Sequence, residues 1–242
     1  MTYSADQLTG GLAAVLAHPD DESFSCAGAL ALAHDAGRLV RLLLLTRGEA
    51  GTADGTPDPE LAEIREEEMR CAAGKIGMSE VTVVDHPDGR LAEVPFSILV
   101  DEIAGWLADR RPDAVITFGA HGVTHHPDHV VVGAATRWAV ERLAESGIAP
   151  NAVYVVAPVF GSGARRYDLS AEEGAASHRI DITAVAGRKL AALACHASQP
   201  DAAEEVADLR AALDRDGVMY EGYNRVRPIV PAPHPVFDTR LV

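Results

Sequence analysis

Five short apolar runs, separated by helical segments, are the feature that most limits how this chain of 242 residues can fold. Each run is rich in Val, Leu, Ile or Ala and shows little alternation between apolar and polar residues. Such runs are typical of strands that helices cover on both faces, because both sets of side chains must then be buried. The predicted strands are Leu12–Leu16, Val40–Thr46, Glu80–Val84, Ala114–Phe118 and Ala152–Val156.

Segments with a helical spacing of apolar residues lie between and after these runs. They are Phe24–Ala36, Pro59–Ile76, Phe96–Ala108, His129–Ala144 and Ile182–His196. Strands that alternate with helices predict a mainly parallel sheet with right-handed crossovers. We therefore expect one α/β domain over residues 1–242, with five or more strands and with helices on both faces of the sheet. The proline-rich tail from Asn224 onward is expected to be extended.

The composition argues against several classes of protein. A net charge of −15 disfavours a nucleic-acid partner, because phosphate binding needs clustered Lys and Arg. No apolar run approaches the roughly 18 residues that a membrane-spanning helix needs. The N-terminus lacks the basic and apolar regions of a signal peptide, so a cytoplasmic location is expected. Cys26, Cys71 and Cys195 are isolated and odd in number, which favours reduced thiols over disulfides.

Two polar clusters follow the first and the fourth predicted strands. The segment Ala17–Glu22 comes directly after the first, and the segment His125–His129 comes shortly after the fourth. Either cluster alone is compatible with a turn and a helix cap. However, the carboxyl ends of the strands in an open α/β sheet form the edge at which ligands bind. Two His-Pro-Asp segments at equivalent places therefore predict one shared site.

The residue types of these clusters predict a catalytic metal centre. A catalytic zinc takes three protein ligands and leaves one position open for water. His18, Asp21 and one histidine of the second cluster, either His126 or His129, are suited to supply them. Asp20 would then be free as a general base toward a metal-bound water, whose pKa the ion lowers from 15.7 towards roughly 7.

The other polar residues of the second cluster are expected to support this chemistry. The histidine that is not a ligand, if protonated, would stabilise the oxyanion or protonate the departing amine. Asp128 could accept a hydrogen bond from one imidazole and fix its tautomer. His121 and His125 are candidates for the rim of the site. Two histidines and one aspartate would also accept Fe²⁺ or Co²⁺ in place of Zn²⁺.

Two segments of the chain, Ala17–Glu22 and His126–His129, resemble the signatures of the PIG-L/LmbE-like family of zinc-dependent N-deacetylases. Weaker family-like features are Thr46–Glu49, Arg65 with Glu68, Asp88-Gly89 and Lys189–Gln199. The resemblance implies a Rossmann-like sheet and one zinc ion per chain.

The resemblance also implies a role for each residue of the two signatures. His18, Asp21 and His129 are the implied metal ligands, Asp20 is the implied general base, and His126 is the implied electrostatic catalyst. It implies weaker roles in binding sugar hydroxyls for four further residues, which surface pairing or helix capping would explain equally well. These residues are Arg47, Glu49, Arg65 and Asp88.

One stretch departs from the family pattern. Related enzymes of the mycothiol pathway carry a tyrosine shortly before the second signature, whereas Gly122–His125 contains none. Either His125 or a tyrosine from elsewhere in the chain replaces it, or the substrate differs.

The implied activity is removal of an N-acetyl or other N-acyl group from an amino sugar or a sugar-containing small molecule. Alternatives are an amidase that acts on a thiol conjugate or a glycosylated natural product, and a non-catalytic binding protein of the same fold. A nucleotide-binding oxidoreductase is disfavoured, because no GxGxxG follows the first strand. The loops Ala50–Asp58 and Val159–Ala176 are candidates for a lid, and a homo-oligomer is compatible with these features.

Overall fold

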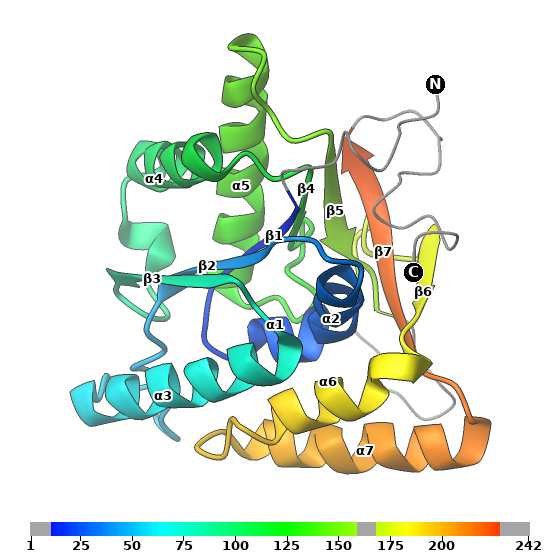
Figure 1. Cartoon of the computed structure of the whole chain (residues 1–242). Helices are drawn as coiled ribbons and strands as arrows, with labels where there is room; N and C mark the ends of the chain where they lie inside the picture. Colours follow the sequence, from blue (N-terminus) through cyan, green and yellow to red (C-terminus); the bar gives the residue numbers. More distant parts are fainter. Residues whose placement is uncertain (1–10, 159–167, 228–242) are drawn as a thin grey trace, which may run out of the picture.

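The computed structural model describes residues 11–158 and 168–227, and their strands form one sheet in the order β3-β2-β1-β4-β5-β7-β6 (Figure 1). The first five strands in this order are parallel, while β7 runs antiparallel to both β5 and β6. This confirms the expected mainly parallel sheet. The strands are β1 (Leu12–Leu16), β2 (Val40–Thr46), β3 (Glu80–His86), β4 (Ala114–Thr117), β5 (Ala152–Val156), β6 (His178–Asp181) and β7 (Tyr220–Arg227).

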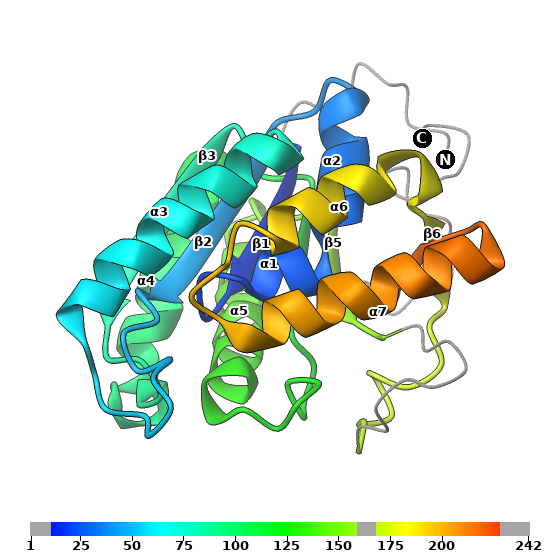
Figure 2. The same cartoon turned by 90° about the horizontal axis from the view of Figure 1, so that it is seen from below.

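Helices cover both faces of the sheet, as Figures 1 and 2 show. α4 and α5 lie on one face, and α2, α3 and α6 lie on the other, with α7 packed on the outside of α6. The helices are α1 (Asp21–Ser25), α2 (Ala27–Asp35), α3 (Pro59–Ile76), α4 (Phe96–Arg110), α5 (Pro127–Glu145), α6 (Ala186–Leu193) and α7 (Pro200–Asp216), with short 3-10 turns at Leu91–Glu93 and Thr183–Val185.

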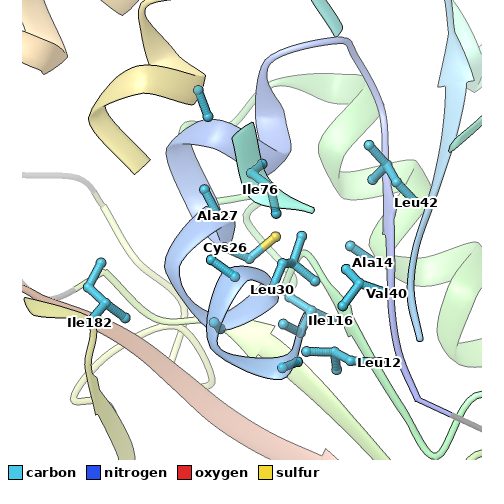
Figure 3. Packing of buried hydrophobic residues seen from close by; sticks show 14 of the residues in the cluster. Leu12, Ala14, Cys26, Ala27, Leu30, Val40, Leu42, Ile76, Ile116 and Ile182 are labelled. Carbon is cyan, nitrogen blue, oxygen red and sulfur yellow. The ribbon is translucent and has the colours of Figure 1, made fainter. Parts of the chain in front are cut away.

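Strand β1 is buried on both faces, which explains its unbroken apolar sequence. Leu12, Ala14 and Leu16 belong to the core beneath α2, α3 and α6, whereas Ala13 and Val15 belong to the core beneath α4 and α5. Figure 3 shows the first of these cores, in which Leu30 of α2 packs near β1. Because neighbouring residues of a strand point to opposite faces, both helix layers rest on the same short strands.

The predicted helix at Phe24–Ala36 is two helices in the structure. α1 begins earlier, at Asp21, because the carbonyl oxygen of Asp20 accepts hydrogen bonds from the amides of Ser23 and Phe24. The chain leaves helical geometry at Cys26, where φ is −149°, and α2 then starts at Ala27. The first turn of α1, with its carboxylates, lies at the carboxyl edge of β1 because α1 begins only five residues after the strand ends.

The C-terminal part of the chain extends the sheet beyond the five expected strands. β6 and β7 form an antiparallel pair along β5, and the sequence reading assigned neither of them. The tail was expected to be extended from Asn224, and its first residues, up to Arg227, do lie in β7. The remainder of the tail lies outside the described residues, as does the first half of the candidate lid after β5, residues 159–167.

A disulfide joins Cys71 of α3 to Cys195, which follows α6, with 5.9 Å between their Cα atoms. The expectation of three reduced thiols was therefore wrong for this pair. The two cysteines are 124 residues apart, so only the packing of α3 against α6 brings them together. Cys26 is the free, buried thiol that was expected. Within the described ranges, no helix combines the length and the apolar character needed to cross a membrane.

Candidate metal and catalytic site

The two polar clusters meet at the carboxyl edge of the sheet, where β1 lies next to β4. From β1 the chain continues to β2 on one side, and from β4 it continues to β5 on the other side. A reversal of this kind leaves a crevice between the diverging connections, which is the usual ligand site of open α/β sheets. The first cluster enters α1 from β1, and the second caps the start of α5.

Three donor atoms from these clusters lie close to one another. Nε2 of His129 is 3.1 Å from Oδ1 of Asp21 and 3.3 Å from Nδ1 of His18, and Nδ1 of His18 is 3.6 Å from Oδ2 of Asp21. The side chains of all three residues are nearly buried. The structure thus brings together the three residues that the resemblance implied as ligands.

Hydrogen bonds on the outer side of each residue set its orientation. Oδ2 of Asp21 accepts hydrogen bonds from the amides of Ala17 and His18, which leaves Oδ1 to face His129. Nδ1 of His129 lies 3.0 Å from the carbonyl oxygen of Gly122, an acceptor, so this nitrogen carries the proton and Nε2 keeps its lone pair.

His18 is oriented by two further carboxylates. Its Nε2 lies 3.0 Å from Oδ1 of Asp88 and 3.3 Å from Oδ2 of Asp128, and both carboxylates are buried. Burial disfavours the charged imidazole, but hydrogen bonds to Asp128, Asp21 and Asp88 outweigh it and raise the pKa of His18 well above its usual range. Since carboxylate oxygens only accept hydrogen bonds, Nε2 is the nitrogen that donates to Asp88 and Asp128, and Nδ1 faces Asp21 and His129, where a bound cation would take the place of its proton.

This donor set fits a divalent cation. Ligands that hold a tetrahedral zinc at 2.0–2.2 Å are about 3.3–3.6 Å from one another, close to the separations found among His18, Asp21 and His129. The buried carboxylates of Asp21, Asp88 and Asp128 also need positive charge nearby, because burying uncompensated anions is costly. Two other groupings around His18 bring donor atoms together, His18 with His126 and His129, and His18 with Asp88 and Asp128.

Asp20 lies beside this cluster in an unusual backbone conformation. Its φ of 124° is rare for a residue with a side chain, and strain of this kind is commonly found at functional sites. Its Oδ2 accepts a hydrogen bond of 2.9 Å from Arg65. Burial raises the pKa of Asp20 to about 6, although the charge of Arg65 opposes the shift. A carboxylate with this pKa is suited to exchange protons near neutral pH.

His126 caps α5 with its side chain. Its Nδ1 accepts a hydrogen bond of 3.2 Å from the amide of Asp128, so this nitrogen is unprotonated. Its ring centroid is 4.6 Å from that of His18. Burial and the neighbouring imidazoles lower the pKa of His126. The sequence was compatible with a protonated His126, whereas these contacts favour a neutral ring that carries its proton on Nε2.

Of the four candidate substrate-binding residues, three make polar contacts with protein partners, and the fourth, Glu49, has a buried oxygen without one in the described part of the chain. Arg65 and Asp88 already have several polar partners: Arg65 also donates to the carbonyl oxygens of Gly48 and Pro19, and Asp88 also accepts from the amide of Ala50. Arg47 forms an ion pair with Glu66 on α3. Glu49 differs, because one oxygen accepts from the amide of Asp88 while Oε2 is buried without a partner among the described residues.

The sequence reading gave no role to a buried polar group next to Asp21. Glu22 is fully buried and accepts a hydrogen bond of 2.5 Å from Ser23, and Nε2 of His196 lies 3.2 Å from both side chains. Burial disfavours the charged form of His196, but Glu22 outweighs it and raises the pKa of His196. The stretch Lys189–Gln199 contains His196 and was noted only as a family-like pattern.

The fold is a Rossmann-like sheet, and buried imidazoles and carboxylates lie together at its switch point. These features define a class of α/β protein with a candidate ligand site at the carboxyl edge of the sheet. The donor atoms of this site are suited to a metal ion. Residues 13–140 match the PIG-L family, which is described as GlcNAc-PI de-N-acetylase, and the chain belongs to this family.

Curated relatives with related sequences are deacetylases. The chain is 27% identical to 1D-myo-inositol 2-acetamido-2-deoxy-alpha-D-glucopyranoside deacetylase of Tsukamurella paurometabola, with 79% of this chain and 84% of the relative covered. It is 29% identical to the probable N-acetyl-alpha-D-glucosaminyl L-malate deacetylase 2 of Bacillus anthracis, with 76% and 79% covered.

Solved structures with the same fold have different activities. N,N'-diacetylchitobiose deacetylase from Pyrococcus horikoshii superposes with a TM-score of 0.69 at 22% identity and covers 96% of this chain and 88% of its own. GalB, the 4-carboxy-2-hydroxymuconate hydratase of Pseudomonas putida, superposes with a TM-score of 0.71 at 22% identity and covers 93% and 99%. The fold alone therefore does not decide the reaction, which must be argued from the site.

Proposed function

We propose that this chain is a zinc-dependent N-deacetylase that hydrolyses an N-acyl amino sugar or a related sugar-containing small molecule. The observation that carries the proposal is the convergence of His18 Nδ1, Asp21 Oδ1 and His129 Nε2 beside the carboxylate of Asp20. The deacetylase names of the curated relatives support the same class of reaction.

In this proposal His18, Asp21 and His129 hold one divalent ion. When bound, such an ion acts as a Lewis acid that polarises the acyl carbonyl and makes a water molecule more acidic. Two histidines and one carboxylate leave a position open on zinc, as in other catalytic sites. Iron or cobalt in the divalent state would also suit these ligands.

Asp20 is the proposed general base. Arg65 holds its Oδ2, and Oδ1 has no hydrogen-bond partner in the described part of the chain, so Oδ1 is available to accept a proton from water. The hydroxyl oxygen then bonds to the acyl carbon. When the carbon–nitrogen bond breaks, the protonated Asp20 returns its proton to the departing amine, so that the carboxylate is restored.

His126 is the proposed donor to the oxyanion that forms at the acyl carbon. Because its Nδ1 accepts the amide of Asp128, its Nε2 carries a proton without any need for an imidazolium. A fixed donor of this kind stabilises the negative charge that develops on the acyl oxygen in the transition state. It therefore raises kcat and does not tighten substrate binding.

Glu49 is the strongest of the proposed contacts to the sugar. Its buried Oε2 is an acceptor without a partner among the described residues, and a sugar hydroxyl would satisfy it. Arg65 and Asp88 are proposed to support Asp20 and His18 as well as to line the pocket, since most of their polar atoms already have protein partners.

Acetate release tests this function directly. The purified chain is incubated with N-acetylglucosaminyl inositol, N-acetylglucosaminyl malate, N,N'-diacetylchitobiose and an N-acyl glucosaminyl thiol conjugate. We expect release of the acid from at least one substrate, loss of activity with a chelator, and recovery with Zn²⁺. Release only from the thiol conjugate would identify the amidase alternative. A fully metal-loaded chain that releases no acid from any of them would contradict the proposal.

A further inference from the structure

A second group of histidines lies at the rim of the site, on the turn between β4 and α5. The amide of His125 donates to the carbonyl oxygen of His121, which closes a tight turn, and Val123 and His125 both have a φ of 62°. The turn places the two imidazoles side by side, with 4.8 Å between their ring centroids. Neither ring belongs to the cluster of His18, Asp21 and His129.

Asp168 meets both imidazoles from a different part of the chain. Its carbonyl oxygen is 3.0 Å from Nδ1 of His121 and 2.8 Å from Nε2 of His125, and its Oδ2 is 3.8 Å from the same Nε2. Each of the three residues has one possible ligand atom for a metal, and these three atoms lie within 4.8 Å of one another. One nitrogen of each imidazole thus faces the backbone carbonyl oxygen of Asp168, with the Asp168 carboxylate nearby, and an ion bound here would replace these two hydrogen bonds.

The two halves of this group are held together without any ion. Glu173 is fully buried, and its carboxylate accepts hydrogen bonds from the amides of His121, Val123 and Ser170, at 2.8–3.1 Å. Glu173 also packs closely against Gly119, where a side chain would collide with it. Since Ser170 follows Asp168 by two residues, Glu173 fixes the segment with Asp168 to the turn with the histidines.

We propose that His121, His125 and Asp168 form a second site for a divalent transition metal, with zinc as the natural candidate. Two imidazoles and a carboxylate are the ligand types that bind zinc, cobalt, nickel and copper in proteins. His125 and Asp168 are exposed, with side chains that are 49% and 89% accessible. Water can complete the coordination here, so the affinity is expected to be lower than at the buried site.

An ion in this position would stiffen the turn that supports the buried site. The carbonyl oxygen of Gly122, between the two histidines, is the acceptor for Nδ1 of His129. His125 is also directly followed by His126, which caps α5. The second ion would therefore restrain the segment 119–126, and hydrogen exchange of its amides would slow on binding.

Zinc binding to the purified chain tests this site. The chain is first loaded with one equivalent of Zn²⁺, and further Zn²⁺ is then titrated by calorimetry with parallel metal analysis after dialysis. We expect a second, weaker binding event of one ion per chain. The double variant His121→Ala/His125→Ala should weaken this event by at least about tenfold, because removing ligands costs more than removing the residues that orient them.

Two further variants make the result specific. His34→Ala removes an exposed histidine elsewhere and should leave the second event unchanged. His18→Ala should abolish the first event and keep the second, so the two sites can fail independently. A wild-type chain that binds a single ion, or a double variant that binds the second ion as tightly as the wild type, would overturn the proposal. So would an equal loss of affinity in His34→Ala.

Discussion

Oδ2 of Asp128 lies 3.3 Å from Nε2 of His18, although 110 residues separate them in the sequence. The same carboxylate accepts hydrogen bonds from the amides of Gly89 and Leu91, and it is fully buried. A residue of the second cluster therefore orients the first histidine of the first cluster. This contact joins the two signatures, which are far apart in the sequence, into one candidate site.

Asp128→Asn should weaken metal binding without unfolding the protein. Both oxygens of Asp128 accept N–H groups, so an amide nitrogen in place of one oxygen would face a donor and release His18. Loss of such an orienting partner typically costs about 10–100-fold in metal affinity. Competition with a chelator measures the change. Asp101→Asn, at an exposed ion pair, is the control and should leave the affinity unchanged.

Asp20→Asn and Asp21→Asn should separate catalysis from metal binding. Asp20→Asn removes the proposed base and should lower turnover by about 10²–10⁴-fold, while the metal content stays at one ion per chain. Asp21→Asn should lose the metal as well as the activity, because Asp21 is a proposed ligand. The opposite pattern of metal loss would mean that the two carboxylates have each other's roles.

His126 should act in its neutral form. Burial and the nearby imidazoles lower the pKa of His126, and a bound cation would lower it further. The neutral ring is therefore present above the ordinary pKa of about 6.5, and activity falls as the pH drops through the lowered value. Between about pH 7 and about pH 9, we expect His126 to cause no decline in kcat/KM. The pH profiles of the wild type and of His126→Gln should therefore have the same shape in this range.

The His126→Gln variant also measures the size of the contribution. Turnover should fall by about 10²–10³-fold, which is typical of removing one donor to an oxyanion, while the metal remains bound. If an alkaline limb is present in the wild type and absent from His126→Gln, the active form of His126 is protonated and the hydrogen bond from Asp128 is not maintained during the reaction.

The disulfide should contribute to stability. It joins α3 to the segment after α6 across 124 residues, so it restricts a long loop of the unfolded chain. Cys71→Ser/Cys195→Ser should lower the free energy of unfolding by about 2–4 kcal/mol in urea titrations. A reducing agent should destabilise the wild type by a similar amount and leave the double variant unchanged. Equal stability of the oxidised wild type and the variant would argue against this contribution.

The elements that form the central sheet could be predicted because their signals are local. β1, β2, β5 and α3 begin and end where the apolar runs and the helical pattern predicted. α3 illustrates the reason: Asp58 accepts the amide of Glu60, Pro59 occupies the first turn, and Gly77 ends the helix at a φ of 87°. Each of these features depends on neighbouring residues only.

Other features depended on distant contacts that the sequence pattern does not reveal. α7 was not assigned, and the structure explains its weak signal: it lies outside α6 and fully buries only Ala202. β7 contains a buried charge, Glu221, which is stabilised by Lys189 of α6 at 2.8 Å. The pairing of Cys71 with Cys195 likewise requires the packing of α3 on α6.

The same distinction holds for the site. His18, Asp20 and Asp21 were recognisable from one short segment, because all three lie within one turn at the end of β1. The two roles of Asp88, in orienting His18 and in accepting the amide of Ala50, follow from the packing of the segment after β3 against β1. His196 reaches Glu22 only because α6 lies beneath α1.

The most direct test is the position of the metal in anomalous diffraction from crystals of the zinc-loaded protein, measured at the zinc edge. We expect a peak bonded to His18 Nδ1, Asp21 and His129 Nε2, at about 2.0–2.2 Å from each donor atom. His18 also contributes its other nitrogen to a second grouping of donors, with Asp88 and Asp128. A peak bonded to His18 Nε2 and those two carboxylates, with none beside Asp21, would contradict the ligand assignment.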